Sequence, residues 1–213
     1  IVLTGGPKSV YGPDAYPLPA EILEAKVPVL GICYGLQLLT QALGGKVSQL
    51  KNAEYGKAIV TLDDSSSPLA KGLPSSFQSF MSHRDCVTVL APGFTAAAHT
   101  PSCPVAIAQD TSRQIYGVQF HPEVTDTEYG QQILENFLFG IVKAAKNWSL
   151  GGFVAAKANE IRTQVGSESR ILLGVSGGVH SSVIAAILSR PVVRRLVLVF
   201  VTHGLLLNIV AAE

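Results

Sequence analysis

The stretch PVLGICYGLQLL, residues 28–39, joins an apolar run to a segment with helical periodicity, with a cysteine between two glycines at the junction. The pattern GICYG, residues 31–35, is the layout of a nucleophile elbow, in which a strand turns sharply into a helix. Cys33 would then lie at a helix N-terminus, whose partial positive charge favours the thiolate over the thiol. The alternative is a small cysteine packed in a buried strand.

The segments around this stretch predict the fold class. IVLTGGP, AEILEAK, VPVLGIC and GLQLLTQALGG alternate strand-like and helical patterns, which is typical of a doubly wound α/β domain. After residue 46 come shorter candidate strands, KAIVTL, VTVLA, AAAHT, PVAIAQ and IYGVQF, and then a helix expected at residues 128–146. We therefore expect an α/β protein with a doubly wound, mixed sheet.

A second α/β unit is expected after this domain. Residues 1–145 form the first domain, residues 146–169 a linker (NWSLGG) and a helix, and residues 170–213 a truncated second unit. RLVLVFV, residues 195–201, reads as a strand buried on both faces; a membrane span over residues 196–212 is disfavoured because His203 and Gly204 interrupt it. Since the chain begins at Ile1 without a leader, we expect a fragment that lacks segments at both ends.

Composition narrows the function classes. Charged residues make up 15% of the 213 residues and the formal net charge is +1, so neither a nucleic-acid partner nor an anionic membrane surface is indicated. The three cysteines form no C-x-x-C or similar paired motif, which fits a protein of the reducing cytoplasm, although one disulfide is not excluded. No metal-binding residues are expected. Small-molecule chemistry is the better expectation.

The segment YGVQFHPEV, residues 116–124, adds a candidate base. Pro122 favours an extended backbone at His121, and residues two apart in an extended chain project to the same side. Glu123 can therefore orient the His121 imidazole while the ring accepts a proton. Together with Cys33, this favours a Cys-His-Glu catalytic group over a histidine in a turn.

The turn TGGP, residues 4–7, also follows an apolar strand. Backbone N–H groups in a Gly-Gly turn can approach a developing oxyanion closely. The amide that follows the nucleophile, that of Tyr34, is the usual second donor. Taken alone, the segment is only a turn.

In this order and spacing, TGGP, PVLGICYGLQ and GVQFHPE resemble the class I (triad) glutamine amidotransferases over about residues 1–145. The resemblance implies that Cys33 attacks the side-chain amide of glutamine, that His121 passes the proton to leaving ammonia and that Glu123 orients His121. It further implies an oxyanion hole and a glutamine-binding set. The oxyanion hole is formed by the amides of Gly6 and Tyr34; the residues that help to hold glutamine are Gln37, Ser82, His83 and Asp85.

Finer matches, GGPKSVY, AEYGKA and MSHRDCV, are similar to the GMP synthetase family, with Arg84 where that family has a small residue. There the amidotransferase domain precedes an ATP pyrophosphatase domain with an S-G-G-V-D-S-S loop, which SGGVHSS, residues 176–182, resembles. The loop, between a strand and a helix, is also an anion nest in its own right, or a helix cap. The residues implied in ATP binding are Ser176, Gly177, Gly178, Ser181 and Ser182.

The resemblance implies glutamine, ATP, Mg²⁺ and xanthosine monophosphate (XMP) as ligands, GMP as product and a homodimer formed through a C-terminal region. His180 and Thr202 replace two expected acidic residues. Because imidazole and hydroxyl groups are poor ligands for Mg²⁺, we expect this chain not to make GMP.

Two alternatives remain: an amidotransferase subunit of another pathway, and an inactive degenerate chain that acts at most as a binding module. Cys86 and Cys103 are assigned to structure because neither lies in a glycine-flanked elbow, and His99 is read as a strand or turn residue.

Overall fold

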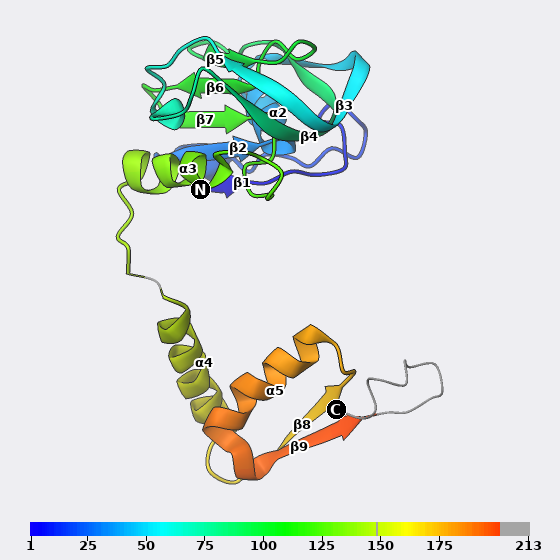
Figure 1. The fold of residues 1–213 in the computed structure, drawn as a ribbon, viewed down its shortest axis with the longest axis vertical. Helices are drawn as coiled ribbons and strands as arrows, with labels where there is room; N and C mark the ends of the chain where they lie inside the picture. The colour runs from blue at the N-terminus through cyan, green and yellow to red at the C-terminus, as the bar shows by residue number, and fades with distance from the viewer. Residues whose placement is uncertain (148, 201–213) are drawn as a thin grey trace. The chain divides into compact units, whose positions relative to one another are not determined.

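The computed structural model describes residues 1–147 and 149–200, which form two compact units, residues 1–145 and a unit that begins at Lys146 (Figure 1). The elements of the first unit, in chain order, are β1 (Val2–Leu3), α1 (Ala20–Glu24), β2 (Val29–Ile32), α2 (Tyr34–Ala42), β3 (Lys46–Leu62), η1 (Pro68–Ala70), β4 (Ser76–Val89), β5 (Thr95–His99), β6 (Ile107–Asp110), β7 (Ile115–Val118), α3 (Gly130–Glu135) and the π-helical turn η2 (Asn136–Ile141).

The strands of the first unit form one seven-stranded sheet in the order β1-β2-β7-β6-β5-β3-β4. The pairs β1–β2 and β2–β7 are parallel, and the other pairs are antiparallel. The predicted α/β class and mixed sheet are therefore confirmed. β3 and β4 are much longer than predicted, because the polar segment KNAEYGK, residues 51–57, continues β3 across a register shift between Gln49 and Glu54.

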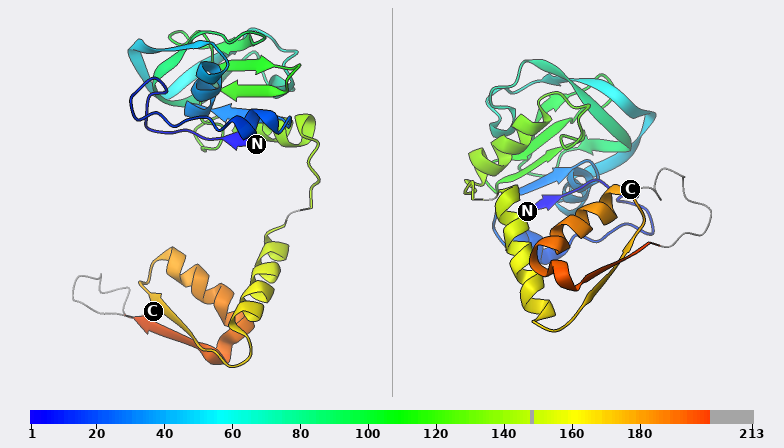
Figure 2. Two further views of the ribbon diagram at one scale, coloured as in Figure 1. Left: turned by 180° about the vertical axis from the view of Figure 1, so that it is seen from behind. Right: turned by 60° about the horizontal axis from the view of Figure 1, so that its bottom comes forward.

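Helices cover both faces of this sheet. α2 packs on one face and α3 with η2 on the other, which the two opposite views in Figures 1 and 2 show. Each face buries its own apolar cluster, as a doubly wound arrangement requires. The α2 face includes Val29, Leu36, Leu39, Val47, Val87 and Ile115; the α3 face includes Leu30, Val60, Phe77, Phe120, Ile133 and Phe137.

The turn from β2 into α2 is held by two glycines. A Cβ atom at Gly31 would lie 2.5 Å from the backbone N of Leu36, and one at Gly35 would lie 2.2 Å from the backbone O of Leu3. Between them Cys33 has φ 51° and ψ −105°, a conformation rare for a residue with a side chain. The predicted elbow is therefore present, and it depends on close backbone packing.

The helix predicted at residues 128–146 is shorter than expected. Tyr129, at φ 58°, precedes α3, and a Cβ atom at Gly130 would lie 2.2 Å from the backbone O of Pro122. The helical turns end at Ile141, and Lys143 has φ 59°, a left-handed conformation that stops the chain from continuing as a helix.

The second unit contains α4 (Leu150–Val165), β8 (Ile171–Val175), α5 (Val179–Val192), η3 (Val193–Arg195) and β9 (Leu196–Phe200), with β8 and β9 parallel. Leu150-Gly151-Gly152, predicted as linker, begins α4 instead, because the Ser149 hydroxyl caps this turn by accepting from the Gly152 N–H at 3.1 Å.

The expectation that residues 195–201 form a strand buried on both faces is wrong within β9: Val197, Leu198 and Val199 are exposed in its two-stranded sheet. Within residues 1–147 and 149–200, no helix is both long and apolar enough to cross a bilayer. The remainder of the apolar tract, including Thr202, lies outside the described residues.

We expect Gly35→Ala to destabilise the protein, because its Cβ atom would meet the backbone of Leu3 and not a flexible side chain. Overpacking of this kind costs about 1–3 kcal/mol or more in the free energy of unfolding, measurable by urea titration. Gly140→Ala is the matched control: no atom lies within 4 Å of its added Cβ, so its midpoint should change little. Equal stability of both variants would contradict the packing described for the elbow.

Candidate active site

Cys33 occupies the N-cap position of α2, directly after β2. Its N–H donates to the backbone O of Val118 in β7 at 2.8 Å, which fixes the elbow against the neighbouring strand. The side-chain amide of Gln119 donates to Cys33 Sγ at 3.6 Å, and Sγ lies 3.8 Å from the backbone O of Ser82. Cys33 is only 4% exposed.

This burial decides the protonation state of the thiol. Desolvation raises the pKa of Cys33 to about 11, and the negative charge of Glu123 adds to the rise. Hydrogen bonds from the Tyr34 backbone and Gln119 act in the opposite direction but do not offset burial. The expectation that the helix N-terminus leaves Cys33 with a lowered pKa is therefore wrong, because burial outweighs the hydrogen bond from the first N–H of α2.

His121 follows β7 and is held by both its neighbours and its backbone. Its Nδ1 lies 2.7 Å from Oε1 of Glu123, two residues on. Its N–H donates to the backbone O of Phe80 at 3.0 Å, and its own backbone O accepts from the Thr127 hydroxyl at 2.6 Å. With the Glu123 carboxylate accepting from Nδ1–H, the neutral ring has its Nε2 lone pair free to accept a proton.

Cys33 and His121 open into one pocket of about 590 Å³. A Cβ atom at Gly5 would lie 2.9 Å from His121 Cε1 and 3.8 Å from Cys33 Cβ, so only a glycine lets both side chains stand against this turn. Within the described residues the thiol makes no hydrogen bond to His121. The pocket is lined by Gly6, Pro7, Lys8, Ser9, Cys33, Gln37, Tyr55, Ser82, His83, Arg84, Asp85 and His121.

All four residues expected to help hold glutamine therefore line this pocket, but three have side chains engaged elsewhere. Gln37 Nε2 donates to the backbone O of Asp85 at 2.7 Å and to Gln119 Oε1 at 3.2 Å. His83 Nδ1 lies 2.9 Å from the same Asp85 carbonyl. Ser82 is exposed.

The Asp85 carboxylate is held by a loop that sequence reasoning missed. The hydroxyls of Ser9 and Tyr11 both donate to it, the latter at 2.8 Å. These residues lie in an irregular segment between β1 and α1, where no periodic pattern marks a side chain as part of a site. The loop forms one wall of the pocket.

The two positions expected to donate to an oxyanion lie side by side. A Cβ atom at Gly6 would lie 3.4 Å from Cγ of Tyr34. The N–H of Tyr34, the first residue of α2, is among the helix N–H groups that have no partner in the helix itself. The Tyr34 hydroxyl accepts from the backbone N–H of Tyr16 at 3.0 Å, so the ring is anchored.

The residues expected to bind ATP share one loop of the second unit, between β8 and α5. Gly177 has φ 75°, and the Ser181 hydroxyl donates to the backbone O of Gly178 at 2.9 Å. The Ser182 hydroxyl donates to the same oxygen at 3.1 Å, and Ser176 Oγ lies 3.3 Å from Ser181 Oγ. Ser176, Gly177, Gly178 and Ser182 are exposed, and Ser181 is half-buried.

Cys86, Cys103 and His99 are not among the residues that line the pocket. Cys86 and Cys103 are fully buried free thiols, and His99, at the end of β5, contacts Asp63 at 2.9 Å. A buried cluster of Glu54, His83 and Cys103 was missed, because its members lie in three segments without a spacing motif. Only the fold brings them together.

Comparison with known proteins gives consistent findings. Residues 1–141 match the family described as glutamine amidotransferase class-I. The chain is 45% identical over 206 residues to a GMP synthase [glutamine-hydrolyzing] of Limosilactobacillus reuteri and 46% identical over 209 residues to one of Streptococcus mutans. Each alignment covers 97% of this chain and 40% of the relative, so the chain spans about 40% of the length of these curated relatives.

Among solved structures, a glutamine amidotransferase of Thermotoga maritima has the same fold, with a TM-score of 0.52, 21% identity and coverage of 90% of this chain and 77% of that one. The family match extends from the Gly-Gly turn through the elbow and the His-Pro-Glu segment to the end of η2. The chain therefore belongs to the class I glutamine amidotransferase family.

Proposed function

We propose that the first unit hydrolyses the side-chain amide of glutamine to glutamate and ammonia, with Cys33 as nucleophile, His121 as base and Glu123 as the residue that orients it. One observation carries this proposal: a cysteine at a positive-φ elbow shares a pocket with a histidine whose Nδ1 lies 2.7 Å from a carboxylate. The family match supports glutamine as the substrate.

The chemistry follows from the protonation states. Because burial keeps Cys33 as a thiol, its proton passes to Nε2 of His121 as the sulfur attacks the amide carbon. Glutamine binding brings the two side chains into hydrogen-bond reach, as is common when catalytic contacts tighten on substrate binding. His121 then protonates the departing nitrogen, ammonia leaves, and water hydrolyses the thioester to glutamate and the free thiol.

The backbone N–H groups of Gly6 and Tyr34 are proposed to stabilise the oxyanion of both tetrahedral intermediates. Preorganised amide donors act strongly here because they need no reorganisation during the reaction. The absence of a side chain at Gly6 supports this role, since the turn packs directly on Tyr34.

Glutamine recognition is proposed to combine backbone and side-chain groups of the pocket wall. Ser82 and Arg84 are exposed at the pocket, and the Arg84 guanidinium offers a positive charge for the α-carboxylate of the substrate. Gln37, His83 and Asp85 shape the wall, since Gln37 Nε2, His83 Nδ1 and the Asp85 carboxylate already have protein partners.

We further propose that the ammonia serves to aminate ATP-activated XMP, giving GMP in purine biosynthesis. The curated relatives named GMP synthase support this, and so does the SGGVHSS loop, whose small residues and exposed hydroxyls suit a pyrophosphate group. His180 offers no carboxylate to Mg²⁺ in that loop, so ATP use by this chain is expected to be weak. The three free cysteines favour the cytosol as its location.

Glutamate release from glutamine by the purified chain tests the first proposal. We expect Cys33→Ala to lower kcat by at least about a thousandfold, because no other group can form the thioester. Glu123→Gln should lower kcat by on the order of 10²-fold. This loss is smaller than that expected for a fully buried orienting carboxylate, because the Glu123 side chain is partly exposed and solvent screens its charge.

His121→Gln and His99→Gln form a matched pair of histidine substitutions in this assay. Both remove a histidine that contacts a carboxylate, but His99 lies outside the pocket, so only His121→Gln should lose turnover. Turnover that survives Cys33→Ala would exclude the proposed mechanism. A folded chain that shows no turnover, with ATP, Mg²⁺ and XMP added, would favour the binding-module alternative.

The protonation state of Cys33 gives a second prediction, tested without glutamine. Because its pKa is about 11, the thiolate is the minor form at pH 8, and alkylation by iodoacetamide should accelerate about tenfold per pH unit up to about pH 10. Peptide mapping identifies Cys33, and a Cys86→Ser/Cys103→Ser variant leaves it as the single thiol. A rate that levels off below pH 8 would contradict the buried, neutral thiol.

A further inference from the structure

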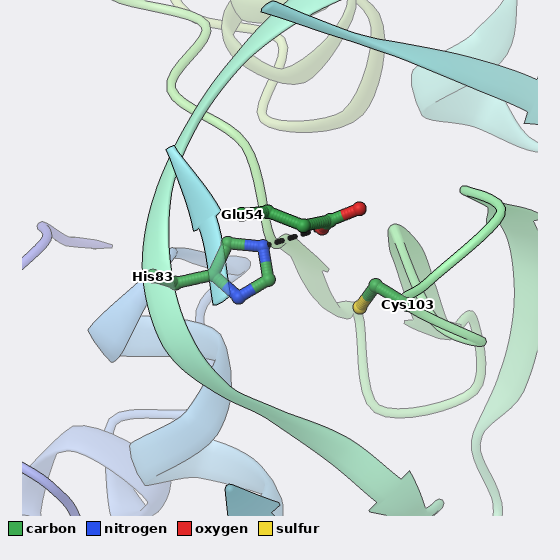
Figure 3. Close-up of side chains that lie close together, drawn as sticks. All are labelled: Glu54, His83 and Cys103. Carbon is green, nitrogen blue, oxygen red and sulfur yellow. Dashed lines mark ion pairs between the residues drawn. The ribbon is translucent and has the colours of Figure 1, made fainter. Parts of the chain in front are cut away.

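Three metal-binding side chains outside the proposed catalytic group converge inside the first unit. Glu54 comes from β3, His83 from β4 and Cys103 from the loop between β5 and β6 (Figure 3). One ligand atom of each lies within 4.8 Å of the others, and all three residues are buried. Imidazole nitrogen, thiolate sulfur and carboxylate oxygen are the donor types of protein zinc sites.

The two ring nitrogens of His83 face different groups, and the contact of Nε2 with Glu54 needs an explanation. Nδ1 lies 2.9 Å from the backbone O of Asp85, which can only accept, so Nδ1 carries the proton. In the neutral ring the Nε2 lone pair therefore faces Oε2 of Glu54, 2.8 Å away. Two lone pairs at this distance repel each other unless a proton or a cation lies between them.

These two facing atoms are buried and lack an aligned partner. The side chains of His83 and Glu54 are 2% and 8% exposed, and Nε2 and Oε2 contact each other as an ion pair, but within the described residues neither atom has a hydrogen bond of good geometry. Buried polar atoms without a partner are rare because desolvating them is costly. A cation coordinated by both atoms would satisfy them, with the two atoms moving apart from 2.8 Å to the separation of about 3.3 Å expected for two ligands of a tetrahedral ion.

The groups around Glu54 and His83 already hold both side chains as metal ligands are held. The hydroxyls of Thr100 and Ser102 donate to Oε1 of Glu54, the former at 2.6 Å, which leaves Oε2 for a cation. Metal-bound histidines likewise donate their second N–H to a carbonyl or carboxylate, as His83 does to Asp85. The backbone N–H of Cys103 donates to Thr100 Oγ1 at 2.9 Å, so the same hydroxyl also positions the loop that carries the sulfur.

A second thiol lies beside the cluster. The Cys103 thiol donates to the backbone O of Val105 at 3.4 Å, and Cys86 and Cys103 are both fully buried and free of disulfides. The Cys86 sulfur is not among the ligand atoms that all lie within 4.8 Å of one another, so Cys86 is a neighbour of the cluster and not one of its ligands. On metal binding the Cys103 thiol would lose its proton to solvent, as thiolate ligation requires.

We propose that Glu54, His83 and Cys103 bind a zinc-type divalent cation. The mixed N, S and O donor set favours Zn²⁺ over Mg²⁺ or Ca²⁺, which prefer oxygen ligands alone. His83 also lines the pocket, so the cluster lies directly behind the pocket wall. The competing explanation is an ion pair between a protonated His83 and Glu54, with no cation between them.

The test uses Co²⁺ as the probe, added to the chelator-treated, reduced full chain under anaerobic conditions. We expect one Co²⁺ per chain, with visible bands of tetrahedral intensity and a near-ultraviolet thiolate charge-transfer band, all displaced by Zn²⁺. Since loss of an outer-shell partner alone costs about 10–100-fold in metal affinity, Cys103→Ser and Glu54→Gln should each weaken binding by about 100-fold or more.

Cys33→Ser is the matched control, because it removes one buried thiol that also lies near a histidine and a carboxylate. It should leave the cobalt spectrum and affinity unchanged. Circular dichroism establishes that each variant is folded, and Zn²⁺ should raise the Tm of the parent chain and of Cys33→Ser but not of Cys103→Ser. Failure of the reduced parent chain to bind Co²⁺, a spectrum without thiolate charge transfer, or a signal lost with Cys33 instead of Cys103 would each overturn the proposal.

Discussion

The close backbone packing at the β2–α2 junction is the constraint on which the site depends. Gly31 and Gly35 let the start of α2 lie against β2 and β1, where any side chain would collide with backbone atoms. That packing holds Cys33 at φ 51° at the carboxyl end of β2, where its side chain lines the pocket. The strained conformation is maintained because the strands and α2 around it are among the most buried parts of the unit. A looser junction would let the cysteine relax and would separate it from His121.

The thiol of Cys33, at this junction, and the imidazole of His121, in the segment after β7, have different electrostatic environments. Burial favours the neutral Cys33 thiol, so the thiolate that is readily oxidised or alkylated is the minor form near neutral pH. In the proposed mechanism His121, whose Nδ1 contacts Glu123, acts as the base from the partly exposed side of the pocket. Behind this pair, Asp85 links the Ser9–Tyr11 loop to Gln37 and His83. His83 thus belongs both to the pocket wall and to the buried Glu54–Cys103 cluster, so a cation bound there would stiffen the wall.

Local patterns in the sequence predicted the elements that carry the proposed chemistry. The GICYG elbow, the extended His121-Pro122-Glu123 segment and the Gly-Gly turn each follow a short apolar strand, and such strands meet in one sheet. The rest depends on contacts between distant residues. The polar residues in β3 gave no sign of how long this strand is, and burial of Cys33 reversed the expected pKa shift. Ser9, Tyr11 and Gln119 lie in the quoted motifs GGPKSVY and GVQFHPE, but only the fold shows that their side chains contact Asp85 and Cys33. Glu54, His83 and Cys103 meet only through pairing of β3 with β4 and folding of the β5–β6 loop over them.

The most direct measurement of the central claim is active-site labelling with a glutamine analogue that carries an electrophilic diazoketone in place of the side-chain amide. The label reacts covalently only where a nucleophile, a proton source and a glutamine pocket coincide. Peptide mapping should find about one label per chain, on Cys33 alone, suppressed by excess glutamine and strongly slowed in His121→Gln. Label on Cys86 or Cys103, or labelling of Cys33 that neither glutamine nor the loss of His121 affects, would contradict the account.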